Sequence, residues 1–464
     1  MACGSTIAKL AAMKSDILKA SPARERLTNL YDEGIFTELD TFAKTGEALT
    51  GVITAFGYVE GTPVYAFSQD STVNDGAVGE AQTKKISKLY DMAAKTGCPV
   101  VGIYDSYGVV VTDGVKALSA YGELLMRTSN LSGVVPQIAV IAGTCAGTAA
   151  MIAASADFVV MSKDAELFIT PNSKSAVGSY AENSAKCGTV SLVCENDAEA
   201  VKTAKILVSK LPMNNITPVP MFEFEQSAAE MNGDAASITA AIADAGSVIE
   251  LSPDFGTAAY TALASMGGAT VGIAATNKTA SKLTADDCSK LARFVRTCDA
   301  FGISVITIVD TEGFELSDEA EISGSLRDMT KLASAYAEAT TAKISLISGK
   351  AYGSAYIALA GKSANADTVI AFADAVISPL APETAVEFLM HDKLKGADDV
   401  DKKRRELAAE YAENEASVFI AAEQGCIDNI IEPSQARASL LAALDMLSGK
   451  RVSTLPKKHS NMPL

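Results

Sequence analysis

The stretch VVPQIAVIAGTCAGTAAMIAASADFVVM, residues 134–161, joins an aliphatic run to an alanine-rich segment through a turn of small residues at 143–148. Its charge-free part is long enough to be considered as a membrane helix, which needs roughly 20 residues. Pro136, Gly143 and Gly147 interrupt it, however, and such turn residues divide a strand pattern from a helix pattern. We therefore predict a buried strand, a tight turn and a helix, with no membrane insertion.

This stretch has a counterpart in the second half of the chain. Similar blocks recur in the same order at offsets between 205 and 212 residues, and self-similarity of this kind indicates a duplicated unit. In two of the pairs an aliphatic strand pattern ends in Asp-x-x-Gly or in a small-residue turn. The pairs are LYDEGIFTEL (30–39) with IADAGSVIEL (242–251), GCPVVGIYDSYG (97–108) with GISVITIVDTEG (302–313), and PQIAVIAGTCAGTA (136–149) with AKISLISGKAYGSA (342–355).

The helices are predicted to repeat as well. Segments 80–95 and 286–301 each place apolar residues on one face, and Thr284 is a candidate N-cap. Gly97 and Gly302 are expected to end the two helices.

The repeat divides the chain into two domains. We predict two copies of one α/β domain, covering residues 1–220 and 221–464, with the join near LPMNNITPVP (211–220).

Composition excludes several classes of function. The chain has 464 residues and a net charge of −17, so it should repel the phosphate backbone of nucleic acid. Lys9 and Lys14 interrupt the N-terminal segment, which therefore lacks the apolar core of a signal peptide, and we expect a cytoplasmic protein.

The sequence offers few residues for binding a metal or for catalysis by histidine. The eight cysteines include no C-x-x-C pair, so we expect reduced, mostly buried thiols and no metal site. The two histidines, His391 and His459, leave a catalytic triad without a candidate base.

The turn at 143–148 could serve different chemistries. It lacks the spacing of a P-loop and of a dinucleotide-binding fingerprint. Cys145 has no partner in sequence that would activate it as a nucleophile. Two interpretations stay open, namely close packing of a helix on a strand and an oxyanion hole built from backbone N–H groups.

The chain resembles the biotin-dependent acyl-CoA carboxyltransferases, a family that includes the propionyl-CoA carboxylase beta subunit, transcarboxylase and the methylmalonyl-CoA decarboxylase alpha subunit. The resemblance runs nearly end to end. It rests on ARERLTNLYDEGIFTELD, YAFSQDSTV, VPQIAVIAGTCAGTAA, ARFVRTCDAFGISVITIVD, YAEATTAKISLISGKAYGSAYIAL, CIDNIIEPSQARASL and KKHSNMPL, in the order of the family.

The resemblance implies an α/β fold with a tandem pair of crotonase-like (ClpP/crotonase) ββα-superhelix domains. The domain 1–220 would hold the acyl-CoA, and the domain 221–464 would hold biotin. Such a protein moves a carboxyl group between carboxybiotin and the α carbon of a short acyl-CoA. The family also implies a homohexamer, a separate biotin carboxyl carrier protein, and either biotin carboxylase or membrane decarboxylase subunits as partners.

The resemblance also assigns site residues. The two oxyanion holes would use the N–H groups of one residue pair in each half, and neighbouring residues would contact the cofactor and line the acyl pocket. The catalytic residues are Gly147, Thr148, Ser354 and Ala355; the cofactor-binding residues are Ala146, Gly353 and Tyr356; and the substrate pocket comprises Ile357, Tyr107, Gly108, Gly313 and Phe314.

The sequence departs from the family near these positions. The second glycine of each turn is replaced by Thr148 and by Ser354, and the added Cβ narrows the approach to the backbone. Tyr107 replaces a glycine and Val110 an arginine in the DSGGAR segment common in relatives. The segment 179–193 lacks the family's Gly-Gly-Ala and His pattern.

These departures leave an alternative, a catalytically impaired structural subunit of a carboxylase or decarboxylase complex. A hydratase on the same fold would need glutamates on the helix after the turn, and residues 149–156 contain none.

Overall fold

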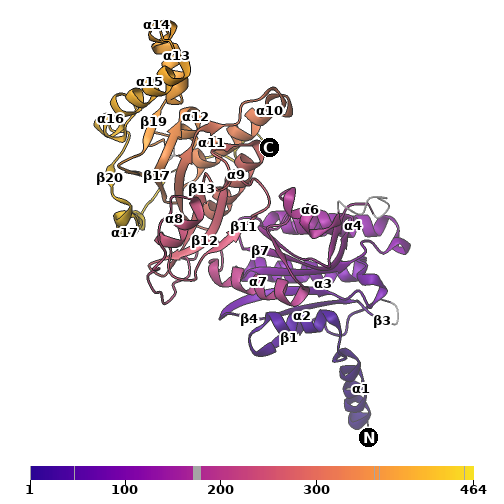
Figure 1. Cartoon of the computed structure of the whole chain (residues 1–464). Coiled ribbons are helices and arrows are strands. Elements are labelled where there is room, and N and C mark those ends of the chain that lie inside the picture. Colours follow the sequence, from indigo (N-terminus) through magenta and orange to yellow (C-terminus); the bar gives the residue numbers. More distant parts are fainter. Residues whose placement is uncertain are drawn as a thin grey trace. The chain divides into compact units, whose positions relative to one another are not determined.

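The computed structural model describes residues 2–45, 48–170, 179–359, 361–364, 366–453 and 455–463. The chain forms two compact units, 1–220 and 221–464. In Figure 1 the first unit runs from indigo to magenta and the second from pink to yellow.

The first unit is built on a mixed sheet with strand order β1-β4-β5-β6-β7-β8-β10, in which β9 lies beside the end of β7. β1, β4 and β5 pair antiparallel, whereas the pairs from β5 onward are parallel. The carboxyl ends of β5 to β8 therefore share one edge of the sheet. The strands are β1 Phe36–Leu39, β2 Lys44–Thr45, β3 Ala48–Leu49, β4 Val52–Val59, β5 Thr62–Gln69, β6 Val100–Ser106, β7 Gln137–Ala146, β8 Phe158–Ser162, β9 Glu166–Phe168 and β10 Leu192–Cys194.

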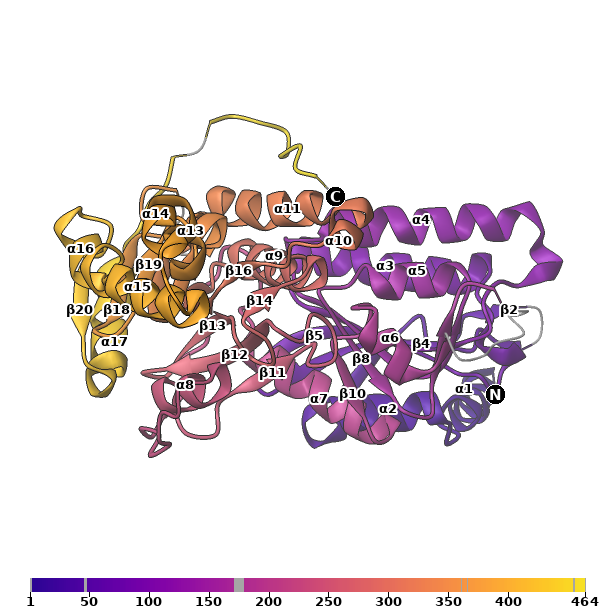
Figure 2. The same cartoon turned by 45° about the horizontal axis from the view of Figure 1, so that its top comes forward.

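Helices cover both faces of this sheet. α2 and α7 pack together on one face, while α3, α4 and α5 cover the other (Figure 2). α3 buries Ile86, Leu89 and Ala93 against the strands, as its apolar spacing predicts. The helices are α1 Ala2–Ile17, α2 Pro22–Leu30, α3 Glu80–Thr96, α4 Val115–Leu131, α5 Thr148–Ala154, α6 Ala181–Lys186 and α7 Asp197–Lys210.

The second unit repeats this topology. Its sheet has the order β11-β12-β13-β15-β17-β18-β20, and β19 lies beside the end of β17 just as β9 lies beside β7. The predicted duplication and the α/β fold class are confirmed. The strands are β11 Ile249–Leu251, β12 Tyr260–Met266, β13 Ala269–Ala275, β14 Lys282–Leu283, β15 Ser304–Thr311, β16 Gly313–Phe314, β17 Lys343–Tyr352, β18 Thr368–Phe372, β19 Val376–Ser378 and β20 Asn429–Ile431.

The second unit also carries an addition. Helices α13 to α15, which follow β19, share a small apolar core of their own around Val386, Leu394 and Leu407. The helices are α8 Ala235–Ile242, α9 Ala285–Ala300, α10 Asp318–Ser323, α11 Ser325–Glu338, α12 Gly353–Leu359, α13 Pro382–Leu389, α14 His391–Lys395, α15 Val400–Asn414, α16 Val418–Glu423 and α17 Ala436–Leu447.

The equivalent helices α3 and α9 begin and end largely as the sequence predicts. The Thr284 hydroxyl accepts from the Asp287 N–H, and the Asp287 carboxylate accepts from the Thr284 N–H, which forms a capping box. Gly97 ends α3 with φ 66°, a left-handed conformation that glycine adopts without a steric penalty.

Two further features bear on the predicted class. No helix in the described ranges has both the length and the apolar character needed to cross a bilayer. The seven cysteines outside α1 are all unpaired, and five of them are buried.

Candidate active site

The first turn lies where β7 ends and α5 begins. Ala146 is the last residue of the strand, Gly147 has φ 64°, and Thr148 is the first residue of the helix. Only glycine takes this φ readily, so Gly147 is what allows the chain to reverse here. The N–H groups of Thr148 and Ala149 lie in the first turn of α5, where they have no acceptor within the helix.

Gly147 itself is not a free donor. Its N–H donates to the carbonyl oxygen of Phe168 in β9, at 2.9 Å. Gly147 was predicted to supply an oxyanion donor, whereas in this structure β9 binds its N–H. The available donors of this turn begin at Thr148 and continue with Ala149.

The second turn has the same construction. β17 ends at Tyr352, and Gly353, with φ 56°, opens α12. A Cβ at Gly353 would lie 3.3 Å from the Pro379 carbonyl oxygen, so a larger residue would crowd the turn. Ser354 is exposed and Ala355 is buried.

The two turns correspond residue by residue. At an offset of 206, Ser354 and Ala355 match Thr148 and Ala149. The pair of Thr148 and Ala149 in the first unit is thus equivalent to the pair predicted in the second.

The predicted pocket glycines lie beside these turns. Gly108 has φ 110°, and a Cβ there would lie 3.5 Å from the Ala146 carbonyl oxygen. Gly313 has φ 112° and faces the Tyr352 carbonyl in the same manner.

An equivalent hydrogen bond, from the backbone N–H to a nearby hydroxyl, fixes each of the two glycines. The Gly108 N–H donates to the Ser106 hydroxyl at 3.1 Å, and the Gly313 N–H donates to the Thr311 hydroxyl at 3.2 Å. The structure therefore places Gly108 at the first turn and Gly313 at the second.

The other predicted pocket residues differ in accessibility. Tyr107 is 62% exposed and Ile357 is 56% exposed, so both side chains can be reached from solvent. Phe314 is half-buried in β16, against which α12 packs. Tyr356 points its hydroxyl at the Cys426 carbonyl, 3.5 Å away, and burial raises its pKa to about 12. Tyr356 thus has a structural contact in addition to its predicted role.

A carboxylate lies behind each turn, and it is buried in the first unit and half-buried in the second. In the first unit, the Asp105 carboxylate accepts from Arg26 Nη1 at 2.9 Å and from the Ser71 hydroxyl at 2.8 Å. In the second unit, the Asp310 carboxylate accepts from the Lys350 N–H at 2.8 Å and from the Asn277 side-chain amide at 2.6 Å.

Each carboxylate lies opposite a β-bulge in the neighbouring strand, β7 or β17, which leads to the turn. The pairing of β6 with β7 shifts register between Tyr104 and Ser106, and that of β15 with β17 shifts between Val309 and Thr311. Such bulges redirect a strand. Here they redirect β7 and β17 just before their turns.

A glycine in each bulge makes room for the carboxylate. A Cβ on Gly143 would lie 2.3 Å from Asp105 Oδ1, and one on Gly349 would lie 2.5 Å from Asp310 Oδ1. Asp105 and Asp310 were not among the predicted site residues, although the repeated Asp-x-x-Gly and the repeated glycine of each strand were the available signals.

Cys145 does not act as a nucleophile in this arrangement. It is fully buried, and burial followed by the nearby charge of Asp105 raises the pKa of its thiol. A thiolate is therefore disfavoured at this position.

Large apolar side chains are exposed on the helices that pack around each turn. α4 packs on α5, and α11 packs on both α10 and α12. Exposed apolar groups of this size favour burial against another surface. They are Val115, Leu118 and Met151 in the first unit, and Ile322, Leu326 and Ile357 in the second.

Comparisons with known proteins agree with this architecture. Residues 21–462 match the family model described as the carboxyl transferase domain. The chain is 38% identical to the methylmalonyl-CoA decarboxylase subunit alpha of Propionigenium modestum, over 95% of this chain and 93% of that protein. It is 36% identical to the carboxyltransferase subunit of propionyl-CoA carboxylase from Haloferax mediterranei, with the same coverage.

A solved structure is similar over nearly the whole chain. It is that of the transcarboxylase 12S subunit, described as a hexamer assembly with methylmalonyl-coenzyme A and methylmalonic acid bound. The TM-score is 0.90 at 34% identity, covering 97% of this chain and 94% of the other.

Proposed function

The chain belongs to the biotin-dependent acyl-CoA carboxyltransferases, and on that basis we propose that it moves a carboxyl group between biotin and the α carbon of a short acyl-CoA. The substrate pair is methylmalonyl-CoA and propionyl-CoA, or malonyl-CoA and acetyl-CoA. The observation that carries this proposal is the pair of equivalent strand–turn–helix sites, one in each unit, each with backbone N–H groups at a tight turn.

In the first unit, the thioester oxygen is held by the N–H groups of Thr148 and Ala149. When the α carbon gains or loses its carboxyl group, negative charge develops on this oxygen as an enolate. Preorganised N–H donors stabilise such a charge without having to reorient during the reaction. Gly108, beside the turn, leaves the approach to the backbone open.

In the second unit, the N–H groups of Ser354 and Ala355 are placed to hold the ureido oxygen of biotin. Gly353 keeps this turn narrow and free of side chains, and Ser354 is exposed, so a planar ring can approach. Bound biotin, delivered on a separate carrier protein, supplies the N1 nitrogen that gives up or receives the carboxyl group.

Neither histidine belongs to either turn. His391 begins α14, and His459 lies in the C-terminal tail, where its ring bonds the Ser460 carbonyl. The proposed mechanism therefore assigns the chain the binding and orientation of the two oxygens, and no histidine base.

We further propose a homohexamer that works with a biotin carrier and with biotin carboxylase or decarboxylase subunits. The support is the hexamer described for the transcarboxylase 12S subunit, together with the exposed apolar side chains around both turns. In this proposal the unit 1–220 takes the acyl-CoA and the unit 221–464 takes biotin.

A catalytically impaired structural subunit is the second candidate. Val110, which occupies the place of an arginine in relatives, is buried, so no cation reaches the first turn from this position. Such a subunit would keep the fold and the assembly but would bind no acyl-CoA.

Two measurements separate the candidates. Purified protein is incubated with free biotin and either malonyl-CoA or methylmalonyl-CoA, and transfer of the carboxyl group is followed by loss of the acyl-CoA. The enzyme is expected to use at least one of the two. Isothermal titration that detects no acyl-CoA binding at millimolar concentration, with the oligomer intact, would favour the structural subunit.

A further inference from the structure

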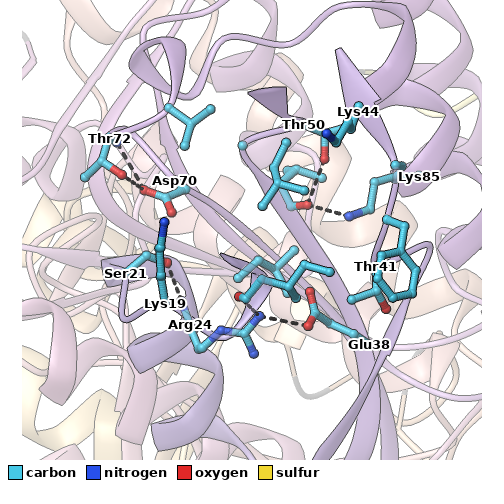
Figure 3. Close-up of a pocket in the computed structure, with 18 of the residues that line it drawn as sticks. Lys19, Ser21, Arg24, Glu38, Thr41, Lys44, Thr50, Asp70, Thr72 and Lys85 are labelled. Carbon is cyan, nitrogen blue, oxygen red and sulfur yellow. Dashed lines mark hydrogen bonds and ion pairs between the residues drawn. The ribbon is translucent and has the colours of Figure 1, made fainter. Parts of the chain in front are cut away.

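A cavity of about 500 Å³ opens in the first unit. It lies among α1, α2, the end of β1, the start of β4 and the segment that follows β5, and Lys85 of α3 lines it as well. Its volume is in the range of small-molecule sites. Figure 3 shows the polar side chains around the cavity, Lys85 among them.

Lys85 has hydrogen-bonding capacity that the fold does not use. It is 4% exposed, and it donates to the Val52 carbonyl at 2.7 Å, the one acceptor that the described residues give it. A protonated lysine has three N–H donors, so the others are left for the cavity. Burial of the charge lowers the pKa of Lys85 to about 8. At pH 7 roughly a tenth of the molecules therefore have the unprotonated amine, which is a nucleophile.

Positive charges predominate around this amine. The charged side chains that line the cavity are Lys19, Arg24, Lys44 and Lys85 against Glu38 and Asp70. Arg24 donates from Nη2 to Glu38 at 2.8 Å, but its buried Nε has no acceptor among the described residues. A concave site with excess positive charge favours an anion.

The equivalent lysine of the second unit is an internal reference. Lys290, at an offset of 205 from Lys85, is 5% exposed, and burial lowers its pKa to about 8 as well. It donates to two carbonyls, those of Gly256 and Ala259, at 3.2 and 2.8 Å, and it does not line the cavity of the first unit. The two lysines thus share burial and acidity. They differ in the cavity and in how fully backbone carbonyls occupy their N–H groups.

From this arrangement we propose that Lys85 is a modification site, at which the amine adds to dissolved carbon dioxide and the resulting carbamate is held by the cations of the cavity. The nitrogen lone pair forms a bond to the carbon of carbon dioxide. The electrons of one carbon–oxygen π bond move to that oxygen, and one N–H proton is released to solvent. The product is a carbamate with a single negative charge, and no oxidant or reductant is needed.

The carbamate suits the charges of the cavity better than the ammonium group does. Its remaining N–H keeps a donor for the Val52 carbonyl, and its two oxygens provide acceptors in a cavity that Arg24 and Lys44 also line. Hydrogen bonds from cations to such an anion are among the stronger ones in proteins. Because a negative charge replaces a positive one, the four basic and two acidic groups of the cavity become three of each.

This inference does not rest on the proposed function. The reaction needs only dissolved carbon dioxide, so it proceeds without biotin or an acyl-CoA. A failed carboxyl-transfer assay leaves the carbamate untouched, and a missing carbamate leaves the carboxyl-transfer proposal untouched.

The test is trapping of the carbamate in the whole protein. Purified protein is equilibrated with isotopically labelled bicarbonate and treated with a trialkyloxonium salt, which converts a carbamate into a stable ester. Proteolysis and mass spectrometry then locate the label. We expect it on Lys85 and expect much less on Lys290 in the same digest. Fragmentation separates Lys85 from its neighbour Lys84, which is exposed and paired with Glu80, and which we expect to stay unlabelled.

Variants test the role of the surrounding cations. Arg24→Gln is expected to lower the labelled fraction of Lys85 about tenfold at sub-saturating bicarbonate, as the loss of one charged hydrogen bond does. Lys44→Gln, at an exposed position, is expected to lower it several-fold. Lys88→Gln is the matched control, because it removes the same charge from α3 at a residue that does not line the cavity. It should label like the wild type.

Three outcomes would overturn the inference. The first is a wild type without label on Lys85 at saturating bicarbonate, and the second is label on Lys290 as complete as that on Lys85. The third is an equal loss in Lys44→Gln and Lys88→Gln, which would show that general surface charge governs the reaction. If Arg24→Gln does not fold, the comparison of Lys44→Gln with Lys88→Gln decides the role of the cations.

Discussion

Thr148 is the residue on which the proposed chemistry depends most directly. As the first residue of α5 it presents an N–H outside the helix ladder, and proline is tolerated at that position because no intrahelical bond is lost. Thr148→Pro removes the donor and is expected to lower kcat about 10²-fold or more. Thr148→Ala keeps the N–H and should stay within a few-fold of the wild type.

Steady-state carboxyl transfer measures both variants, and circular dichroism verifies that they fold. An unchanged rate in Thr148→Pro would refute the oxyanion role of this turn.

Lys85 predicts a pH effect on stability. Burial lowers its pKa from 10.5 to about 8, opposed by the charges of Glu38 and Asp40 and assisted by Arg24. The unfolded chain keeps this proton until about pH 10.5, so the free energy of unfolding gains a contribution as pH rises from 8 toward 10.5. Below pH 8 the cost of burying the charge is fully present.

Urea denaturation of the wild type and of Lys85→Met at pH 7.5 and pH 9.5 measures this contribution. Between these two pH values, the free energy of unfolding of the wild type should rise by roughly 2 kcal/mol relative to that of the variant. Lys290, whose pKa burial also lowers to about 8, is present in both proteins and cancels in the difference. A constant difference between the two proteins would contradict the prediction.

At the residue scale, the sequence predicted where the turns lie but not which of their N–H groups are already hydrogen-bonded. Thr148 and Ser354 lie at the two strand–turn–helix junctions. The Gly147 N–H is bound by the Phe168 carbonyl, and Phe168 reaches it only through the pairing of β9 with β7. Hydrogen bonds between segments separated by some 20 residues leave no local sequence signal.

Among the elements, the bulged strands β7 and β17 restrict the residue type most closely, because each bulge has room only for glycine. Gly143→Ala would place a Cβ 2.3 Å from the Asp105 carboxylate, so either the strand or the carboxylate must move. We expect a loss of roughly 1–3 kcal/mol in stability, as for other overpacked interiors, together with reduced transfer. Gly349→Ala should behave alike in the second unit.

Thermal unfolding provides the measurement, with Gly122→Ala as the control. Gly122 lies in α4 with open space around its Cβ position, so alanine there should be neutral or stabilise by about 0.5–1 kcal/mol. Equal unfolding temperatures for Gly143→Ala and Gly122→Ala would rule out the steric argument.

The elements themselves were largely predictable. α3 and α9 follow their apolar periodicity, and the Thr284 cap follows its capping-box pattern. The bulges were not foreseen, because a register shift depends on the carboxylate that fills it. Arg26, which helps to hold Asp105, comes from α2, far away in sequence.

For the whole molecule, the proposed hexamer predicts a mass. Six copies of a 48.1 kDa chain weigh about 290 kDa, which light scattering of the purified protein should detect. Leu326→Glu places a charge among exposed apolar side chains around the second turn and is expected to weaken the assembly.

Ile216→Glu is the control, since Ile216 is similarly exposed but lies in the segment that joins the two units. A wild type that is monomeric at micromolar concentration would refute the assembly.

At this scale the duplicated fold was the most secure inference from sequence, because several blocks recur in one order. The helices α13 to α15 were not foreseen, since the described residues of the first unit contain no counterpart from which they could be recognised.

The equivalence of Thr148 and Ser354 has a chemical consequence. Each of these residues brings a hydroxyl to the start of its turn. A hydroxyl can donate one hydrogen bond and accept others. Each turn therefore carries a side-chain donor beside its backbone N–H groups, so the two units offer the same two kinds of donor.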